Sequence, residues 1–571
     1  MTDPSAPSSP SAPPAPPATV ADLVRGRAGD PRPGLRVDDR TWTWAEVVEA
    51  SERVAARLRR LPGDDGAPRH VAVLLGNTPD YLFVLFGAAL AGVTVVGLNS
   101  TRRGEELARD VRGTDCRLVL TDAELVGLLD GADLDGVPVV RVDDPGWPAT
   151  GADAGADADA DAIDAVGPTA ASPTPQDRFV LIFTSGSTGT PKAVQMSHAR
   201  ATRAAVNTTW FGPDDVLYAA MPLFHGNALN AIVLPALSTG ASIALRNRFS
   251  ASQFMPDVRR YGATFFSTVG RALAYVLGTP ELPDDRDHHV KFALAPESSP
   301  ADMKAFKQRF GITCFGGYGS SENAIILSPV PGMPRDALGK PPDDVDAAVV
   351  DPETMEERPR ARFDEGGRLL NADECVGELV GRNVADRFEG YYGNPEADAQ
   401  RMRNGWYWSG DLVYRDEDGI FYFAGRSGEW LRVDSENLAV APLERILGRF
   451  PAVAGVAVYP VPDERTADDQ VMAAIEVAPG QDWDVDAFSA FLAEQPDLGP
   501  KWLPRYLRIT TLPVTATNKV DKAPLRRERW FTDDVLYWRE GRATTYAPFG
   551  KVELDALAER FGTYGRDINR I

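Results

Sequence analysis

The chain has 571 residues, too many for one ordinary hydrophobic core, so two or more domains are expected. Hydrophobic residues make up 43% and charged residues 25%, which are the proportions of a soluble globular protein. The net charge of −22 argues against nucleic acid or an anionic membrane as a partner, and any site for a polyphosphate must gather its basic residues locally.

The cysteines and the first residues indicate the compartment. Cys116, Cys314 and Cys375 are widely separated and lack metal-ligand spacing, so they are expected to be reduced core residues of a cytoplasmic protein. No apolar run approaches the length of a membrane span. Residues 1–20 begin with a Pro/Ser/Ala-rich stretch that has no basic residue until after position 18, which predicts a disordered tail rather than a signal peptide.

Helical and strand patterns alternate along the first part of the chain. Helical patterns cover residues 21–60 (interrupted by a strand at 35–37), 79–91 and 105–112, and strand patterns cover 71–75, 93–98 and 117–121. This alternation predicts an α/β domain with a largely parallel sheet. Residues 151–176 are acidic and poor in large apolar residues, which predicts a solvated linker within the domain.

Residues 180–194 read as a buried strand followed by a loop dense in hydroxyl groups and glycine. Gly186 and Gly189 let the backbone approach a ligand closely, and exposed N–H groups form a nest for anions. Lys192 adds a positive charge suited to phosphate. The loop therefore predicts a site for the phosphates of ATP, although it lacks Walker A spacing and a plain surface loop is the alternative.

The chain then continues with α/β elements and a second glycine-rich segment. A strand ends at His225 and is followed by a small apolar helix at 226–237, further strands at 263–268 and 292–295, and a helix at 301–310. Residues 316–323 contain Tyr318, two hydroxyl groups and the carboxylate of Glu322. A carboxylate beside a phosphate loop calls for a cation, and Mg²⁺ commonly binds one or two carboxylates plus phosphates. A turn with a solvated Glu is the alternative.

Beyond residue 343, short alternating strands predict an antiparallel subdomain. Asp411 is expected in a tight Gly-Asp turn, where its carboxylate can bind ribose hydroxyls, with Arg426 assisting at the sugar or at a phosphate. Residues 416–419 predict a hairpin turn.

Strands at 453–459 and 471–477 and a helix at 485–494 predict a small αβ unit, followed by a polar loop that carries Lys519. Residues 530–571 suggest no role.

Taken in order, these segments resemble the adenylate-forming superfamily from about residue 21 to residue 527. Residues 184–194 resemble its phosphate loop, Tyr318-Gly-Ser-Ser-Glu322 its Tyr-Gly-x-Thr-Glu motif, Ser409-Gly-Asp-Leu412 its Thr-Gly-Asp-Leu motif, and Gly390-Tyr-Tyr-Gly-Asn-Pro-Glu396 its Gly-Tyr-x-x-x-Pro-Glu motif. Residues 426–438 are similar to a pattern of the fatty-acid-transport and very-long-chain acyl-CoA synthetase branch.

The resemblance implies an α/β fold with a large N-terminal domain at 21–424, formed by parallel-type sheets and a small β subdomain. A hinge at 425–429 and a small mobile αβ domain at 430–571 would follow. It also implies a ligase that cleaves ATP to AMP and pyrophosphate, with Mg²⁺, to activate a fatty or aromatic carboxylic acid. CoA would accept the acyl group. The oligomeric state is not implied.

The resemblance also implies a role for each motif residue. Glu322 would hold Mg²⁺, Lys519 would bridge the acid and the α-phosphate, and His225 would gate the acyl pocket. The nucleotide would contact Thr184, Ser185, Gly186, Ser187, Thr188, Gly189 and Lys192 through its β- and γ-phosphates, Ser321 near the α-phosphate, and Asp411 and Arg426 at the ribose. Tyr318 would also bind the nucleotide.

Two neighbouring positions depart from the family pattern. Ser435 replaces a glycine close to the pantetheine tunnel, and Asp434 adds negative charge where the phosphates of CoA approach. These positions favour an alternative acceptor. Some relatives in this branch resemble ATP-dependent diazotases, which adenylate nitrite and transfer it to an aromatic amine. A non-catalytic ATP-binding protein is a third hypothesis, against which the complete set of Glu322, Asp411 and Lys519 argues.

Overall fold

The computed structural model describes the chain except for residues 1–16, 62–67, 148–171, 185–190, 270, 297, 299, 335–336, 366, 368, 427–429, 434–435, 465–468, 499–501, 516–517, 542, 565 and 569–571. It consists of two compact units, of which the first comprises residues 1–183 and 193–248 and the second comprises 184–192 and 249–571. Most of the predicted tail and linker lie outside the described residues. The first helix already begins at Val20, inside the predicted tail.

The main sheet of the first unit has six strands in the order β6-β5-β3-β4-β7-β8. Their bounds are β3 His70–Leu74, β4 Thr94–Gly97, β5 Cys116–Thr121, β6 Val139–Arg141, β7 Arg178–Thr184 and β8 Lys192–Ser197. The pairs β3–β4, β3–β5, β4–β7 and β5–β6 are all parallel. The predicted parallel sheet is therefore confirmed.

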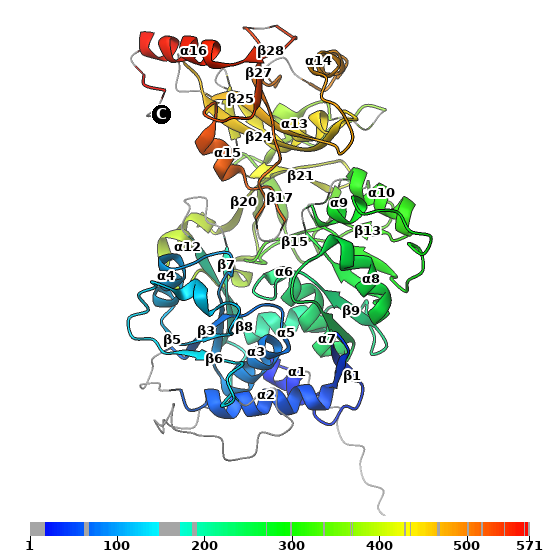
Figure 1. Ribbon diagram of the computed structural model, residues 1–571, viewed down its shortest axis with the longest axis vertical. Coiled ribbons are helices and arrows are strands. Elements are labelled where there is room, and N and C mark those ends of the chain that lie inside the picture. Colours follow the sequence, from blue (N-terminus) through cyan, green and yellow to red (C-terminus); the bar gives the residue numbers. More distant parts are fainter. Residues whose placement is uncertain are drawn as a thin grey trace, which may run out of the picture. The chain divides into compact units, whose positions relative to one another are not determined.

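Two helices pack together beside this sheet, α2 (Trp44–Leu58) and α3 (Pro79–Ala91) (Figure 1). A capping box between Thr43 and Glu46 begins α2, and Pro79 occupies the first turn of α3, where a missing N–H costs nothing. A Cβ at Gly87 of α3 would lie 2.7 Å from the carbonyl oxygen of Ser51 in α2. Glycine therefore permits the close approach of the two helices.

A second set of strands in the first unit pairs in the order β9-β10-β1-β2. The bounds are β1 Pro33–Val37, β2 Arg40–Thr43, β9 Val216–Ala219 and β10 Ser242–Leu245. Strand β2 forms an antiparallel hairpin with β1 and interrupts the region predicted as helical. Four further helices of this unit are α1 Val20–Arg25, α4 Glu105–Gly113, η1 Val126–Leu129 and α5 His198–Val206.

The apolar helix predicted at 226–237 is divided into three pieces. These are α6 (Gly226–Ala228), a π-helical turn η3 (Leu229–Val233) and α7 (Leu234–Thr239). Pro235 lies in the first turn of α7 and has no N–H to continue an α-helical ladder, which accounts for the break.

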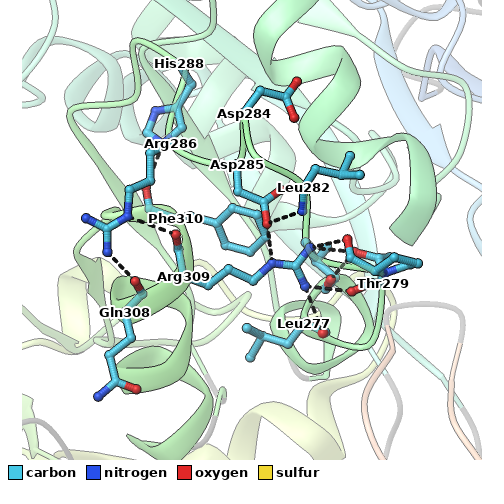
Figure 2. Close-up of polar contacts among 12 residues, drawn as sticks. Leu277, Thr279, Leu282, Asp284, Asp285, Arg286, His288, Gln308, Arg309 and Phe310 are labelled. Atoms are coloured by element: carbon cyan, nitrogen blue, oxygen red, sulfur yellow. Dashed lines mark hydrogen bonds and ion pairs between the residues drawn. The ribbon is translucent and has the colours of Figure 1, made fainter.

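In the second unit, three parallel strands are flanked by helices. The strands are β11 Phe265–Ser267, β12 Phe292–Leu294 and β13 Cys314–Phe315, and the helices are α8 Ala251–Tyr261, α9 Ala272–Leu277 and α10 Pro300–Phe310. Arg309 at the end of α10 pairs with the buried Asp285 at 2.6 Å and donates to the carbonyl oxygens of Leu277 and Thr279 (Figure 2). This guanidinium fixes the segment between α9 and β12.

An antiparallel sheet follows, in the order β16-β21-β20-β18-β17, with β19 paired to β20. The bounds are β16 Ala337–Gly339, β17 Ala347–Val350, β18 Gly377–Gly381, β19 Met402–Arg403, β20 Trp406–Arg415 and β21 Phe421–Arg426. The predicted antiparallel subdomain and the hairpin turn at 416–419 are confirmed. The short helices α11 Ala372–Cys375, η4 Ala385–Arg387 and α12 Pro395–Arg401 belong to this region.

The C-terminal part contains a hairpin and a five-stranded sheet in the order β24-β25-β26-β27-β28. The bounds are β22 Trp430–Val433, β23 Glu436–Ala439, β24 Val453–Pro462, β25 Asp469–Val477, β26 Tyr506–Ile509, β27 Val535–Trp538 and β28 Ala547–Phe549, with helices α13 Val440–Leu447, α14 Val485–Ala493, α15 Lys522–Glu528 and α16 Lys551–Thr563. The predicted strands and helix of the αβ unit are confirmed.

Residues 530–571, for which the sequence suggested no role, extend this sheet. They supply β27, β28 and α16, and α16 lies beside β28 (Figure 1). Trp530, Phe549 and Phe561 are buried in one core cluster with Tyr506 of β26. Within the described residues, no helix combines the length and the apolar character needed to cross a lipid bilayer.

The buried His198 makes the first unit sensitive to acid. Its Nδ1 accepts the backbone N–H of Val20, and burial lowers its pKa from 6.5 to about 4. The folded state thus excludes a proton that the unfolded chain binds below pH 6.5. The contribution of neutral His198 to the free energy of unfolding is complete above pH 6.5. Up to about 3 kcal/mol of this contribution is expected to be lost as the pH falls towards 4.

Thermal unfolding of the wild type and of His198→Asn, measured from pH 7.5 to pH 4, checks this expectation. Asn keeps an acceptor for Val20 but does not titrate. The variant should therefore lose less stability in acid than the wild type, and parallel losses in both proteins would refute the assignment.

Candidate active site

Glu322 is the central carboxylate of the site, and it is buried, with 5% of its surface exposed. It lies between the strands of a short antiparallel hairpin, β14 (Tyr318–Gly319) and β15 (Ile326–Leu327). Its Oε1 accepts a hydrogen bond of 2.5 Å from the Tyr391 hydroxyl. The same oxygen lies 3.8 Å from Nη2 of Arg401. Among the residues that the structure describes, Oε2 has no hydrogen-bond or ion-pair partner, so it remains able to accept a ligand.

Arg401, the last residue of α12, connects this carboxylate to strand β20. Its Nε donates to the Tyr391 hydroxyl at 3.0 Å, and its Nη1 donates to the backbone carbonyl oxygens of Trp408 (3.2 Å) and Ser409. Tyr391 is fixed from a second side, because its backbone N–H donates to Asp398 of the same helix at 2.7 Å. One turn of α12 thus positions both ends of Tyr391.

Lys192 approaches the same tyrosine from the end of the phosphate-type loop. Its Nζ lies 5.3 Å from the centre of the Tyr391 ring and 3.5 Å from Oε1 of Gln400. Burial and the nearby Arg401 lower the pKa of Lys192, while Glu322 and Asp398 partly offset this effect. Two cations therefore lie close to one buried carboxylate, a distribution that leaves positive potential available to a polyanion.

Tyr318 and Asp411 form a second polar contact in this unit. The Tyr318 hydroxyl donates to Oδ2 of Asp411 at 2.6 Å. Burial and the neighbouring Asp411 carboxylate raise the pKa of Tyr318 well above its usual value, so the phenol stays protonated as a donor. The Cα of Arg426 on β21 is the register partner of Asp411, so the two positions lie side by side in the sheet.

Asp411 lies inside strand β20, so its predicted location in a tight turn is wrong. The strand register slips between β18 and β20, leaving Ser409, Gly410 and Asp411 in a bulge. Gly410 has φ +72°, and its N–H donates to the buried carboxylate of Glu378 at 2.9 Å. The bulge supplies the unusual backbone that the sequence motif had suggested would come from a turn.

The other predicted residues are distributed as follows. Thr184 ends β7, and its hydroxyl lies 3.5 Å from the carbonyl oxygen of Lys192. Ser321 occupies the turn after β14, and Ser185, Gly186, Ser187, Thr188 and Gly189 lie outside the described residues. His225 is the N-cap residue before α6 in the first unit, with the centre of its ring 4.5 Å from that of Phe224. Lys519 lies in a hairpin closed by the Val514–Val520 bridge.

The structure brings together Lys192, Tyr318, Glu322 and Asp411 and adds residues that sequence reasoning missed. Tyr391 stands inside the Gly-Tyr-x-x-x-Pro-Glu motif, which was a usable signal. Glu378 and Arg401 belong to no motif that was recognised. Their roles depend on contacts with β20, which lies close to them only in the folded chain.

The chain matches known proteins over most of its length. The family model described as AMP-binding enzyme matches residues 26–392. The steroid-22-oyl-CoA synthetase of Rhodococcus jostii (strain RHA1) is 48% identical over 561 residues, which cover 96% of this chain and 98% of that relative. The medium/long-chain-fatty-acid–CoA ligase FadD17 of Mycobacterium marinum is 44% identical, covering 89% of this chain and 95% of that relative.

Solved structures agree on the fold. The benzoate CoA ligase of Burkholderia xenovorans LB400 aligns with a TM-score of 0.74 and 22% identity, covering 89% of this chain and 99% of the other. At that identity the likeness concerns architecture alone, and it agrees with the α/β fold expected from the sequence. The chain therefore belongs to the AMP-binding enzyme family of the adenylate-forming superfamily, and it is an ATP-dependent, AMP-forming ligase.

Proposed function

We propose that this ligase activates a large apolar carboxylic acid, either a steroid side-chain acid or a medium- to long-chain fatty acid, and transfers it to CoA. The observation that carries the proposal is the 48% identity to a steroid-22-oyl-CoA synthetase, which extends over nearly all of both chains. The fatty-acid alternative is favoured by the 44% identity to a medium/long-chain-fatty-acid–CoA ligase.

The proposed reaction has two steps. A carboxylate oxygen of the acid attacks the α-phosphorus of ATP, and the bond to pyrophosphate breaks, which yields an acyl-adenylate. The thiol sulfur of CoA then attacks the acyl carbonyl carbon, and AMP leaves with the carboxylate oxygen. Both steps build negative charge on oxygen, so positive groups that are already in place lower the barriers.

We propose the residue roles that the resemblance to the superfamily implies. Lys192 and the hydroxyl-rich loop from Thr184 hold the β- and γ-phosphates, and Ser321 lies near the α-phosphate. Asp411 and Arg426 hold the ribose, with Tyr318 orienting Asp411. Lys519 bridges the acid and the α-phosphate, and His225 gates the acyl pocket. The convergence of Lys192, Glu322 and Asp411 in one unit supports these assignments.

The residues around Glu322 fit a magnesium ion. The described residues contain no group of three or more His, Cys, Asp or Glu side chains that could hold a metal by themselves. Mg²⁺ needs only one or two carboxylates when phosphates and water complete its shell. Glu322 offers Oε2 while Tyr391 occupies Oε1. When bound, the ion would neutralise charge on the phosphates.

The names of the relatives support CoA as the acceptor. Both relatives above are described as CoA ligases or synthetases. Asp434 and Ser435, which had favoured a different acceptor, lie outside the described residues. The diazotase alternative receives no support from these relatives.

A cytoplasmic location is supported by the cysteines. Cys116, Cys314 and Cys375 are all free, and burial raises the pKa of each thiol to about 12. Thiols of this kind are unreactive, as expected of structural cysteines in a reducing compartment.

A panel of acids distinguishes the substrate classes. Pyrophosphate release should be fastest with steroid side-chain carboxylates or with C8–C18 fatty acids, and slower by at least about tenfold with benzoate or anthranilate, because small acids leave apolar surface unburied. AMP release with and without CoA, followed by detection of the thioester, identifies the acceptor. Turnover that requires nitrite, with an aromatic amine that carries no carboxyl group, would refute the proposal.

The Tyr318–Asp411 hydrogen bond predicts the effect of a single hydroxyl group. Tyr318→Phe should raise KM for ATP about tenfold, because a hydrogen bond to a charged group is lost while the ring stays. Tyr422→Phe is the matched control. In the wild type the Tyr422 hydroxyl also donates to a carboxylate, that of Asp416 at 3.0 Å, in the hairpin between β21 and β20, the strand that contains Asp411. Equal KM values in both variants would contradict the role of Tyr318.

Lys519→Ala tests the first half-reaction separately. The rate of acid-dependent pyrophosphate exchange should fall by about 100-fold or more, because the cation that stabilises the transition state is lost. Thioester formation from a supplied acyl-adenylate should be much less affected. Lys522→Ala is the control, because its ammonium group pairs with Glu444 at 2.9 Å. A variant that retains normal exchange would exclude Lys519 from this step.

A further inference from the structure

The polar contacts in the second unit, together with the backbone from Tyr318 to Glu322, form a closed circuit, which we call the polar ring. It consists of Tyr318, Glu322, Tyr391, Arg401, Ser409 and Asp411. Tyr318 and Glu322 come from one short segment, and Ser409 and Asp411 come from one bulge. Arg401 and Tyr391 join the two segments on the side opposite the Tyr318–Asp411 hydrogen bond.

Arg401 determines the direction in which the Tyr391 hydroxyl donates its hydrogen bond. A guanidinium group can only donate, so the Tyr391 hydroxyl must accept from Nε of Arg401. The single phenolic proton is then directed to Oε1 of Glu322. This hydrogen bond occupies Oε1 and fixes the orientation of the carboxylate group. The direction of Oε2 is then fixed as well. Without Arg401, the hydroxyl could rotate and the carboxylate could turn.

The same guanidinium also holds the bulge. Its Nη1 donates to the carbonyl oxygens of Trp408 and Ser409, while Glu378 accepts the N–H of Gly410 from the other side. The Ser409–Gly410 peptide is therefore clamped at both of its polar ends. A Cβ at Gly410 would lie 2.3 Å from Nη1 of Arg401, so only glycine leaves room for the guanidinium.

We propose that Arg401 is a positioning residue for nucleotide binding, which couples the Glu322 carboxylate to the Ser409–Asp411 bulge. Through Tyr391 it aims Oε2 of Glu322 at the magnesium–triphosphate group, and through Ser409 it holds Asp411 at the ribose. The two ends of the nucleotide are thereby held at a constant separation. This inference rests on the ATP-dependent function proposed above and adds a residue outside the family motifs that the sequence displays.

Preorganisation explains why one residue should affect both ends of the ligand. Ordering a carboxylate and a backbone bulge only when ATP arrives would take free energy from binding. Arg401 makes this ordering part of the folded state, at the end of a helix whose other residues already contact Tyr391 and Lys192. Loss of the guanidinium should therefore weaken binding more than it slows the chemistry of bound substrate.

The test compares Arg401→Met, Arg401→Lys and Tyr391→Phe with Arg415→Met. Arg415 is a matched control, because it also lies in this subdomain, pairs with a glutamate (Glu357) and donates to a backbone carbonyl (Ala347). Binding of Mn²⁺·ATP without an acid substrate is measured by isothermal titration calorimetry. KM for ATP and kcat are measured by acid-dependent pyrophosphate exchange.

Arg401→Met should weaken Mn²⁺·ATP binding by about 10- to 100-fold and raise KM for ATP equally, with kcat reduced less than about fivefold. Arg401→Lys should recover part of the affinity, because one ammonium group reaches the Tyr391 hydroxyl or the Ser409 carbonyl but not both. Arg415→Met should leave both constants unchanged. The double variant with Tyr391→Phe should lose less than the product of the single effects, because the two residues act through one hydroxyl.

Three results would overturn the proposal. They are unchanged Mn²⁺·ATP affinity in Arg401→Met, an equal loss in Arg415→Met, or fully multiplicative effects in the double variant. If the wild type bound Mn²⁺·ATP but turned over no acid of the panel, the proposed function would fail while the role of Arg401 could still be measured. Thermal unfolding of each variant separates a binding defect from a loss of folded protein.

Discussion

The proposed nucleotide site depends on the polar groups that surround one buried carboxylate. Glu322 is almost fully buried, and a buried carboxylate without polar partners would destabilise the fold. The Tyr391 hydroxyl and the guanidinium of Arg401 provide the compensation, and Lys192 adds a second cation nearby. Two cations beside one carboxylate leave positive potential for the polyanion that we propose binds here.

Much of the fold could be predicted from local patterns. Alternating helices and strands indicated the parallel sheet, and Asp416 to Gly419 indicated the hairpin between β20 and β21. The helix at 226–237 was predicted as one piece, because apolar composition conceals the break at Pro235. Strand β2 was missed because four residues with one buried tryptophan, Trp42, carry too little periodicity.

The site was predictable only in part. The glycine-rich segments, and single carboxylates such as Glu322 and Asp411, lie in recognisable motifs. The residue types in these motifs and the order of the motifs along the chain therefore indicated a nucleotide site. Arg401 resembles any exposed arginine at the end of a short helix, and nothing nearby in sequence shows that it contacts β20. The location of Asp411 was predicted wrongly because a Gly-Asp pair is common in turns, whereas here a bulge within a long strand gives glycine its positive φ.

The C-terminal extension has a consequence for solubility. If the sheet ended at β26, that strand would present unpaired N–H and C=O groups, on which other chains can add strands. Strand β27 pairs with this edge, and the new edge is β28, which has three residues and contains Pro548. A strand so short, with no N–H at its centre, is a poor template. The final segment thus protects this edge of the sheet against edge-to-edge aggregation.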